Sequence, residues 1–264
     1  MNQYELDYKE IVKYVLQRGE RKQGRNGITK SVFGITLGIT LNEGFPLLTS
    51  RKIFYKGVFG ELAAMLRGPK TVADFENQGC NYWKLWADLD GNLELDYGNA
   101  WLDFNGVNQL QYVIDTLKTN PNDRRMVISG WRPDRLDKLS LPCCHYAYQF
   151  YVREGRYLDM LWTQRSADLM VGVPSDVVFG AAWIIMLANE VGYKPGRLIL
   201  SLGDVRIYDE HTILANEYVQ KSVYGLPAYY INKPEGAKLV DFTAQDITVI
   251  GYQHKDTMFF ELKA

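Results

Sequence analysis

The chain is poor in the residues that hold metals or disulfide frameworks. Its 264 residues include three cysteines and three histidines, and no CxxC pair with the spacing of a zinc site occurs. Cys143 and Cys144 are adjacent, which disfavours a bridge between them, and an odd cysteine count fits a disulfide framework poorly. Residues 1–5 also lack the basic and apolar blocks of a signal peptide. We therefore expect no metal and a reducing, cytoplasmic setting.

Charge imbalance and long hydrophobic runs are also absent. Thirty basic and 31 acidic residues nearly cancel, so nothing indicates a nucleic-acid or membrane surface. The longest apolar run, residues 177–188, is too short to cross a bilayer and predicts a buried helix. Neither a P-loop nor a GxGxxG motif occurs, so the usual cradle for triphosphates or dinucleotides is missing. A cluster of arginines could still bind one small anion.

Residues 1–264 are predicted to form a single α+β domain. The length suits one large domain, and no Pro/Gly/Ser-rich linker divides the chain. Helical periodicity and β-branched or alternating segments predict helices at 4–17, 56–66, 110–117, 177–191 and 210–219, and strands at 32–41, 126–131, 146–152, 157–164, 198–207, 247–252 and 258–262. Because no regular βαβ rhythm appears, we expect a mostly buried sheet that carries helices.

Several local signals set the ends of these elements. The polar segment 21–27 predicts a turn, and Arg153-Glu154-Gly155 predicts a hairpin between the two strands that flank it. Thr71 is expected to cap a short helix. Pro174 is expected to open the buried helix, at a position that suits proline.

Cys144 is a candidate nucleophile. Its thiol lies beside the imidazole of His145, at the start of an aromatic strand. Near cationic arginines such a thiol would have a depressed pKa and more thiolate at neutral pH. A free cysteine is more often a buried structural residue, so this residue alone leaves both interpretations open.

Three arginines are candidates for anion binding. Arg165 lies in the middle of a predicted strand among apolar residues, where an unpaired charge is expensive, so it needs a phosphate or a structural carboxylate. Arg124 and Arg125 follow a turn and precede a strand. Adjacent strand residues point to opposite faces, so both reach one anion only at the irregular start of the strand. A solvated surface pair is the simpler interpretation of these two.

Three carboxylates are candidates for proton transfer or ligand contact. Glu61 lies on an otherwise apolar helix, where burial can raise the pKa of a carboxyl and suit it to general acid–base work. An exposed helical glutamate is the default alternative. Asp168 and Asp176 have equally simple alternatives, as a turn residue and as a carboxylate near a helix N-terminus.

Taken together, these segments resemble the thymidylate synthase family over nearly the whole chain. The matching segments, in chain order, are Phe45-Pro46-Leu47-Leu48-Thr49, Gly60-Glu61-Leu62, Trp83 with Trp86, Tyr97-Gly98, Asp123-Arg124-Arg125, Leu141-Pro142-Cys143-Cys144-His145, Gln149-Phe150-Tyr151-Val152, Gln164-Arg165-Ser166-Ala167-Asp168, Gly172-Val173-Pro174, and Gly203-Asp204 with Tyr208 and His211. So many matches in one order are a specific signal. The resemblance implies a thymidylate synthase-like bent mixed β-sheet with packed helices, an obligate homodimer, and 5,10-methylenetetrahydrofolate as the one-carbon donor.

The resemblance also assigns roles. It implies that Cys144 adds to C6 of a pyrimidine nucleotide, which makes C5 nucleophilic, and that Glu61 organises proton transfer and water. The other residues that it implies are Tyr97 and Asp176 for catalysis; Arg25, Arg165, Ser166, Gln164, Arg206 and Tyr208 for the nucleotide; Arg124 and Arg125 for the phosphate of the neighbouring subunit; and Trp83, Asp168, Gly172 and Ala264 for the folate.

One departure from the family bears on the base. Ser175-Asp176 stands where the family has Phe-Asn, and the family asparagine donates to O4 of uracil and accepts from N3–H. An ionised carboxylate cannot donate. It can accept from the exocyclic amine of cytosine and favour a proton on N3, which draws electrons from C6. Residues 175–180 also resemble the corresponding segment of phage deoxycytidylate (dCMP) hydroxymethylases. We therefore predict conversion of dCMP to 5-hydroxymethyl-dCMP.

Other departures leave alternatives open. Arg206 replaces a histidine that normally meets the ribose, Arg132 an asparagine and Cys143 a proline, and the arginine loop 25–30 is one residue short. The altered sugar contact leaves a CMP hydroxymethylase open, as in nucleoside-antibiotic pathways. Trp83 and a full-length C-terminus resemble the methylating branch. The remaining alternatives are a dCMP C5-methyltransferase, a thymidylate synthase acting on dUMP, and an inactive nucleotide-binding homologue.

Overall fold

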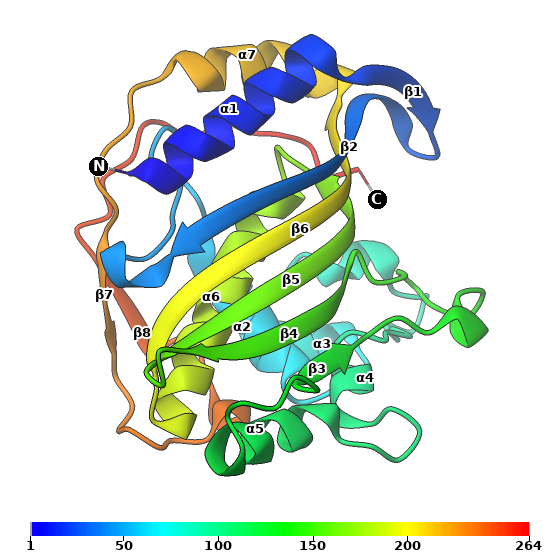
Figure 1. The fold of residues 1–264 in the computed structure, drawn as a ribbon. Coiled ribbons are helices and arrows are strands. Elements are labelled where there is room, and N and C mark those ends of the chain that lie inside the picture. The colour runs from blue at the N-terminus through cyan, green and yellow to red at the C-terminus, as the bar shows by residue number, and fades with distance from the viewer. Residues whose placement is uncertain (1, 264) are drawn as a thin grey trace.

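A six-stranded mixed sheet organises the chain (Figure 1). The computed structural model describes residues 2–263. The strand order is β1 (Glu20–Gly24), β2 (Gly27–Thr40), β6 (Lys194–Tyr208), β5 (Tyr157–Asp168), β4 (His145–Arg153) and β3 (Val127–Ser129). Strands β5 and β6 run parallel, and every other neighbouring pair is antiparallel. The long strands bend across the molecule, as the predicted α+β fold requires.

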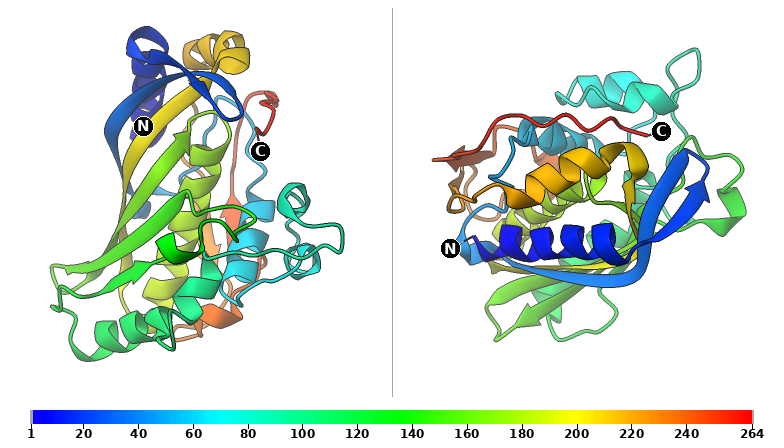
Figure 2. Two further views of the ribbon diagram at one scale, coloured as in Figure 1. Left: turned by 90° about the vertical axis from the view of Figure 1, so that its right-hand side faces the viewer. Right: turned by 90° about the horizontal axis from the view of Figure 1, so that it is seen from above.

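The helices cover one face and the upper edge of this sheet (Figure 2). Their bounds are α1 (Gln3–Arg18), α2 (Tyr55–Met65), α3 (Val72–Glu76), α4 (Gly98–Leu102), α5 (Gln109–Thr119), α6 (Gly172–Val191) and α7 (Thr212–Gln220). Helix α6 packs against β5, β6 and α2, while α1 packs against β2 and α7. A small second sheet pairs β7 (Ala228–Ile231) with β8 (Ile247–Ile250).

Helix α6 forms the centre of the core. Among the described residues it is the one helix long and apolar enough to cross a bilayer, but 78% of its most apolar window is buried inside the fold. Its apolar sequence is therefore explained by packing on all sides. Within residues 2–263, no helix covers the opposite face of the sheet (Figure 2). Three large apolar side chains, those of Val127, Tyr151 and Leu161, are exposed on that face and alternate with buried residues of the same strands.

Local chemistry explains where several elements begin. Thr71 and Asp74 form a reciprocal capping box that starts α3, as predicted from the sequence. The β4–β5 hairpin turns through Glu154 and Gly155, whose φ angles are +57° and +61°. A glycine adopts such an angle without strain, which suits the second of these positions.

Four predictions about elements need correction. Residues 258–262 alternate between buried and exposed like a strand, but no neighbouring strand pairs with them, so the segment is only extended. Most of the predicted turn at 21–27 is strand β1, because its polar residues pair with β2 at an exposed edge. Helix α6 begins at Gly172, before Pro174 and well before Val177. Strand β7 and helix α4 were not predicted at all.

Candidate active site

One cavity of about 1030 Å³ gathers most of the candidate residues. It opens between the β1–β2 turn, the ends of β5 and β6, the start of α6 and the C-terminal segment. The candidates that line it are Arg25, Glu61, Trp83, Tyr97, Cys144, Gln164, Arg165, Ser166, Asp168, Gly172, Asp176, Arg206 and Tyr208. A volume of this size accommodates two small molecules or one large one.

Of the two adjacent cysteines, only Cys144 faces this cavity. Its backbone N–H donates to the Tyr97 hydroxyl over 2.8 Å, which fixes the position of the residue. A register irregularity follows directly, between His145 and Ala147, where β4 begins. The Cys143 thiol is buried and points to the Gly130 carbonyl at 3.5 Å instead.

The pKa of the Cys144 thiol departs from the sequence prediction. Burial raises this pKa above its usual range, the nearby Asp176 raises it further, and Arg165 lowers it less. The predicted depression is therefore wrong for the protein without ligand. The physical reason is that loss of water around the thiol outweighs the attraction of one guanidinium.

Two backbone carbonyls orient the guanidinium of Arg165. Its Nε donates to the Cys143 carbonyl at 2.8 Å and its Nη2 to the Pro142 carbonyl at 2.9 Å. Within the described part of the chain no carboxylate lies within ion-pair distance of this guanidinium. Its charge is therefore available to an anion in the cavity, and the structural-carboxylate interpretation is wrong.

Two more arginines bring positive charge to the same region. Arg206 Nη2 donates to Ser166 Oγ at 2.7 Å, and Nη1 lies 3.4 Å from Asp204 Oδ1. Arg25 lies at the exposed β1–β2 turn and donates to Asn26 Oδ1 at 2.9 Å. The segment that ends at Lys263 lies next to this turn, since Asn26 Nδ2 donates to the Lys263 carbonyl at 3.3 Å.

Glu61 is held by two donors from the loop after α3. Tyr82 Oη donates to Oε2 at 2.5 Å, and Trp83 Nε1 donates to Oε1 at 2.8 Å. Burial raises the pKa of Glu61 to about 7, although both hydrogen bonds lower it. A carboxyl that titrates near neutral pH suits general acid–base work, as expected from the apolar helix around it.

Asp176 lies in the second turn of α6. Its Oδ2 accepts a 2.8 Å hydrogen bond from Gln164 Nε2. Gln164 also donates to the Ser166 carbonyl at 2.8 Å, and its Oε1 accepts from Trp162 Nε1 at 3.1 Å. These contacts fix the orientation of the amide, because the flipped amide would face donor with donor and acceptor with acceptor. Burial raises the pKa of Asp176 to about 7.

Aromatic side chains form a wall in another part of the cavity lining. Trp83 stacks on Phe75 with ring centroids 4.8 Å apart, and Trp86, Phe259 and Leu262 also line the cavity. Such a wall fits a flat conjugated ring such as that of a folate. At its edge, Asp168 Oδ1 accepts from the backbone N–H groups of Met170 and Val171, and burial raises the pKa of this carboxyl.

Two of the predicted site residues do not line the cavity. Arg124 and Arg125 are exposed and lie outside the cavity lining, and Arg125 pairs with Asp123 at 2.7 Å. Ala264 lies outside the described residues. Within residues 2–263, no group of three or more His, Cys, Asp or Glu side chains could hold a metal ion.

The structure adds residues that the sequence did not single out. Tyr82 contacts Glu61 only because the loop after α3 folds back on α2, so no local pattern marks it. The sequence marks His145 only as the neighbour of Cys144; the structure places it in the cavity lining, with its Nδ1 2.5 Å from the Tyr148 hydroxyl. Burial lowers the pKa of His145 to about 3, so the imidazole is neutral at physiological pH.

Known proteins share this sequence along nearly its full length. The family profile described as thymidylate synthase matches residues 6–264. A curated protein named thymidylate synthase, from Corynebacterium aurimucosum, is 38% identical over 260 residues, which cover 96% of each chain. The chain therefore belongs to the thymidylate synthase family and is an enzyme of folate-dependent one-carbon transfer to C5 of a pyrimidine.

Proposed function

We propose that this enzyme hydroxymethylates C5 of a cytosine nucleotide, converting dCMP to 5-hydroxymethyl-dCMP with 5,10-methylenetetrahydrofolate. The observation that carries the proposal is the hydrogen bond from Gln164 to Asp176 inside the cavity. Because Gln164 presents only N–H groups to position 176, the Asp176 oxygen next to it must accept. Among residues 2–263 no donor reaches the other oxygen, Oδ1, so that atom is available to a base.

A cytosine edge complements this carboxyl better than a uracil edge does. Cytosine offers an N4 amine that donates and a basic N3 that can share a proton with Asp176. The pKa of about 7 keeps such a shared proton within reach at neutral pH. A proton on N3 withdraws electrons from C6, where a nucleophile must add. Uracil presents a weakly basic O4 instead, which leaves an ionised carboxylate facing another acceptor.

The remaining residues have matching roles in the proposal. The Cys144 thiolate adds to C6, which is common for an activated cysteine nucleophile. Arg25, Arg165 and Ser166 hold the phosphate, and Arg206 and Tyr208 hold the sugar; all five residues line the cavity. Charge from the guanidinium groups favours a monophosphate, which accepts several charge-assisted hydrogen bonds.

The aromatic wall holds the co-substrate in this proposal. When bound, 5,10-methylenetetrahydrofolate supplies the one-carbon unit. Trp83 packs against its ring, Asp168 and Gly172 lie at the ring's edge, and the C-terminal segment with Ala264 covers it. Glu61, with Tyr82 and Trp83 as donors, holds water and moves protons at the pyrimidine. Tyr97 holds the nucleophile through the Cys144 N–H.

The polar surroundings of Asp176 favour a product that carries a hydroxymethyl group on C5 rather than a methyl group. Ser175 lines the cavity beside Asp176, and its Oγ lies 3.4 Å from the Val171 carbonyl. A serine and a carboxyl at this place can orient a water molecule, whereas a dry site excludes it. Water that adds to the activated one-carbon unit gives a hydroxymethyl group.

A homodimer is part of the proposal. The face of the sheet that carries no helix exposes 62% of Tyr151, 41% of Val127 and 38% of Leu161. Apolar side chains gathered on one uncovered face are typical of a protein–protein interface. Arg124 and Arg125 are exposed and have no role in their own cavity, so they can serve the phosphate of the partner subunit. Each subunit would act as one catalytic domain, residues 1–264, in the cytoplasm.

A second candidate function is methylation of dUMP. It is favoured by one observation, the 38% identity to the curated protein named thymidylate synthase. Methylation of dCMP and hydroxymethylation of CMP are further possibilities for the same cavity, since Arg206 alters the sugar contact. An inactive homologue is disfavoured because Cys144, Glu61 and the arginines of the cavity are all present.

One experiment separates these candidates. The enzyme is incubated with 5,10-methylenetetrahydrofolate and with dCMP, CMP or dUMP in turn, and the products are identified by mass. The expected product is 5-hydroxymethyl-dCMP. A methylated uracil nucleotide as the main product would overturn the proposal, and turnover of any of the three would exclude the inactive homologue.

A further inference from the structure

The loop that carries the nucleophile is bound to one neighbouring segment at several points. This loop, residues 132–144, leaves the sheet after β3 and returns to it at Cys144. It lies against residues 94–97, which precede α4. Backbone contacts join the two at Ser140, whose N–H donates to the Glu94 carbonyl at 2.9 Å and whose Oγ accepts from the Glu94 N–H at 3.1 Å.

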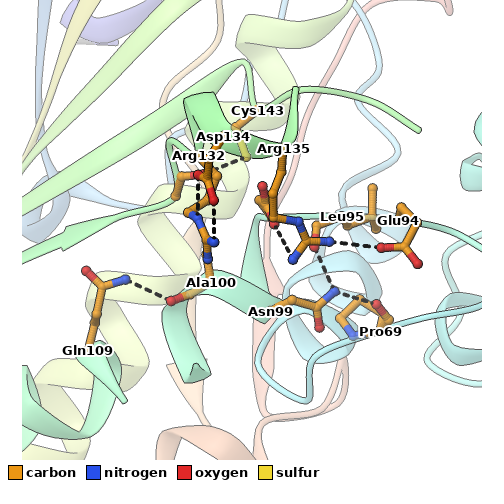
Figure 3. Close-up of polar contacts among 12 residues, drawn as sticks. Pro69, Glu94, Leu95, Asn99, Ala100, Gln109, Arg132, Asp134, Arg135 and Cys143 are labelled. Atoms are coloured by element: carbon orange, nitrogen blue, oxygen red, sulfur yellow. Dashed lines mark hydrogen bonds and ion pairs between the residues drawn. The ribbon is translucent and has the colours of Figure 1, made fainter. Parts of the chain in front are cut away.

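Arg135 adds a charged contact between the same two segments (Figure 3). Its Nη2 lies 3.0 Å from Glu94 Oε2, and its Nη1 lies 3.5 Å from Asp96 Oδ1. One planar guanidinium therefore spans two carboxylates that are two residues apart. Glu94 is exposed, but the Asp96 side chain is only 2% exposed, so the second pair is largely shielded from water.

Asp96 is a buried carboxyl that the proposed chemistry does not use. Its Oδ2 is buried and has no hydrogen-bond partner within residues 2–263. A buried carboxylate without a cation is costly, so Arg135, with a weaker contribution from Arg132, makes Asp96 acceptable at this place. Arg135 is thereby held over residues 94–97 more firmly than an exposed ion pair alone would hold it.

Segment 94–97 is itself held in place by its neighbours. Asn99 Nδ2 donates to the Pro69 carbonyl at 2.9 Å and the Leu95 carbonyl at 3.0 Å (Figure 3). Gly98 approaches α2 so closely that an added Cβ would lie 1.8 Å from the Met65 carbonyl oxygen. Tyr97 lies between these anchors, and its hydroxyl accepts the Cys144 N–H.

We propose that Arg135, through Glu94 and Asp96, is a positioning residue that fixes the nucleophile loop on the Tyr97 segment and so places Cys144. The proposal rests on the proposed nucleophilic role of Cys144. Arg135 touches neither substrate nor reacting atoms and does not line the cavity. Arg135 therefore affects how the Cys144 thiolate is positioned for attack on C6. A displacement of a reacting group by about 1 Å costs on the order of 100-fold in rate.

The three cysteines of the chain provide a direct measurement of loop position. Cys143 belongs to the loop and is buried, Cys80 is buried in the loop after α3, and Cys144 faces the cavity. Iodoacetamide labelling of the folded enzyme, followed by peptide mass, measures each thiol separately. Lifting of the loop exposes Cys143 alone, whereas general loss of stability exposes Cys80 as well.

The test compares Arg135→Met with Arg132→Met. Arg132 is the matched control because its ion pair, 2.8 Å to Asp134, stays within the loop and its attraction for Asp96 is weaker than that of Arg135. In Arg135→Met we expect Cys143 labelling to rise at least about ten-fold with Cys80 unchanged, and kcat to fall by roughly 10- to 100-fold with a small change in KM. Labelling needs no substrate, so its result is independent of which nucleotide the enzyme uses.

Further variants test the proposal even if Arg135→Met does not fold. If Arg135→Met does not fold, Arg135→Lys tests the same point, because one ammonium cannot span both carboxylates as the guanidinium fork does. Glu94→Gln combined with Asp96→Asn should reproduce the effect, and adding Arg135→Met to that pair should cause little more. Wild-type Cys143 protection and kcat in Arg135→Met, parallel exposure of Cys80, or an equal effect of Arg132→Met would each overturn the proposal.

Discussion

Gln164 Nε2 donates to Asp176 Oδ2 over 2.8 Å, and this contact determines which atoms position 176 can present to a base. Gln164 is fixed from behind by Trp162 and the Ser166 carbonyl. With an ionised aspartate at position 176, the atom left for the base is an acceptor. An asparagine there would turn its carbonyl to Gln164 and leave its NH₂ as a donor.

Replacement of this carboxyl should therefore change the base that the enzyme prefers. In Asp176→Asn we expect kcat/KM to shift from dCMP toward dUMP by roughly ten-fold to a hundred-fold, since an unsatisfied buried hydrogen bond costs about 1–3 kcal/mol. Steady-state kinetics with both nucleotides measures the ratio. Wild-type preference for dUMP over dCMP would contradict the assignment.

Of the two adjacent thiols, only that of Cys144 should be required for catalysis. Only Cys144 lines the cavity, while Cys143 is buried against Gly130. Release of tritium from C5 of labelled substrate should vanish in Cys144→Ala and survive in Cys143→Ala. Loss of exchange in a folded Cys143→Ala enzyme, with Cys144 intact, would mean that the wrong thiol has been assigned.

The buried carboxyls should make stability depend on pH. Burial raises the pKa of Glu61 from 4.5 to about 7, so between these values the folded protein retains a proton that the unfolded chain releases. This contribution is fully present below about pH 4.5 and is lost as the pH rises through 7. At about 1.4 kcal/mol per pKa unit, it amounts to roughly 3 kcal/mol.

The neutral isostere removes this dependence. Relative to wild type, Glu61→Gln should therefore be more stable at pH 8 than at pH 5 by roughly 2–3 kcal/mol, because the variant has no proton to lose. Urea denaturation at the two pH values measures the difference. A constant difference between the two proteins would show that Glu61 is not held protonated by the fold.

Arg125 and Cys144 should complement each other across subunits. Arg125 is exposed and absent from its own cavity, so a role in catalysis requires the partner subunit. Mixing inactive Cys144→Ala with inactive Arg125→Ala should restore part of the activity, because one of the two sites in a mixed dimer has both groups. If subunits exchange but no activity returns, these arginines serve their own subunit.

The product should carry a hydroxymethyl group. Hydroxymethylation leaves tetrahydrofolate, whereas methylation oxidises the folate to dihydrofolate, which raises the absorbance of the folate band. We expect no such rise during turnover of dCMP, because Ser175 and Asp176 provide a polar place for water beside the base. Stoichiometric dihydrofolate with a methylated product would leave a dCMP methyltransferase instead.

The sequence by itself determined the family, the fold class and thirteen of the candidate residues that line the cavity. Periodicity located α1, α2, α5 and the long strands, because amphipathic and buried elements carry their pattern locally. It located their ends less well: α6 begins at Gly172, and the polar segment 21–27 is mostly strand, because pairing with β2 outweighs its polarity.

Only the tertiary structure decided the pKa shifts of the cavity residues and the contacts that hold these residues in place. Desolvation reversed the pKa shift expected for Cys144, and it depends on which side chains exclude water there. Tyr82 reaches Glu61, and Arg135 reaches Asp96, across 21 and 39 positions of the chain. A residue's type is fixed by sequence, but its neighbours and its dielectric surroundings arise only when distant segments pack together.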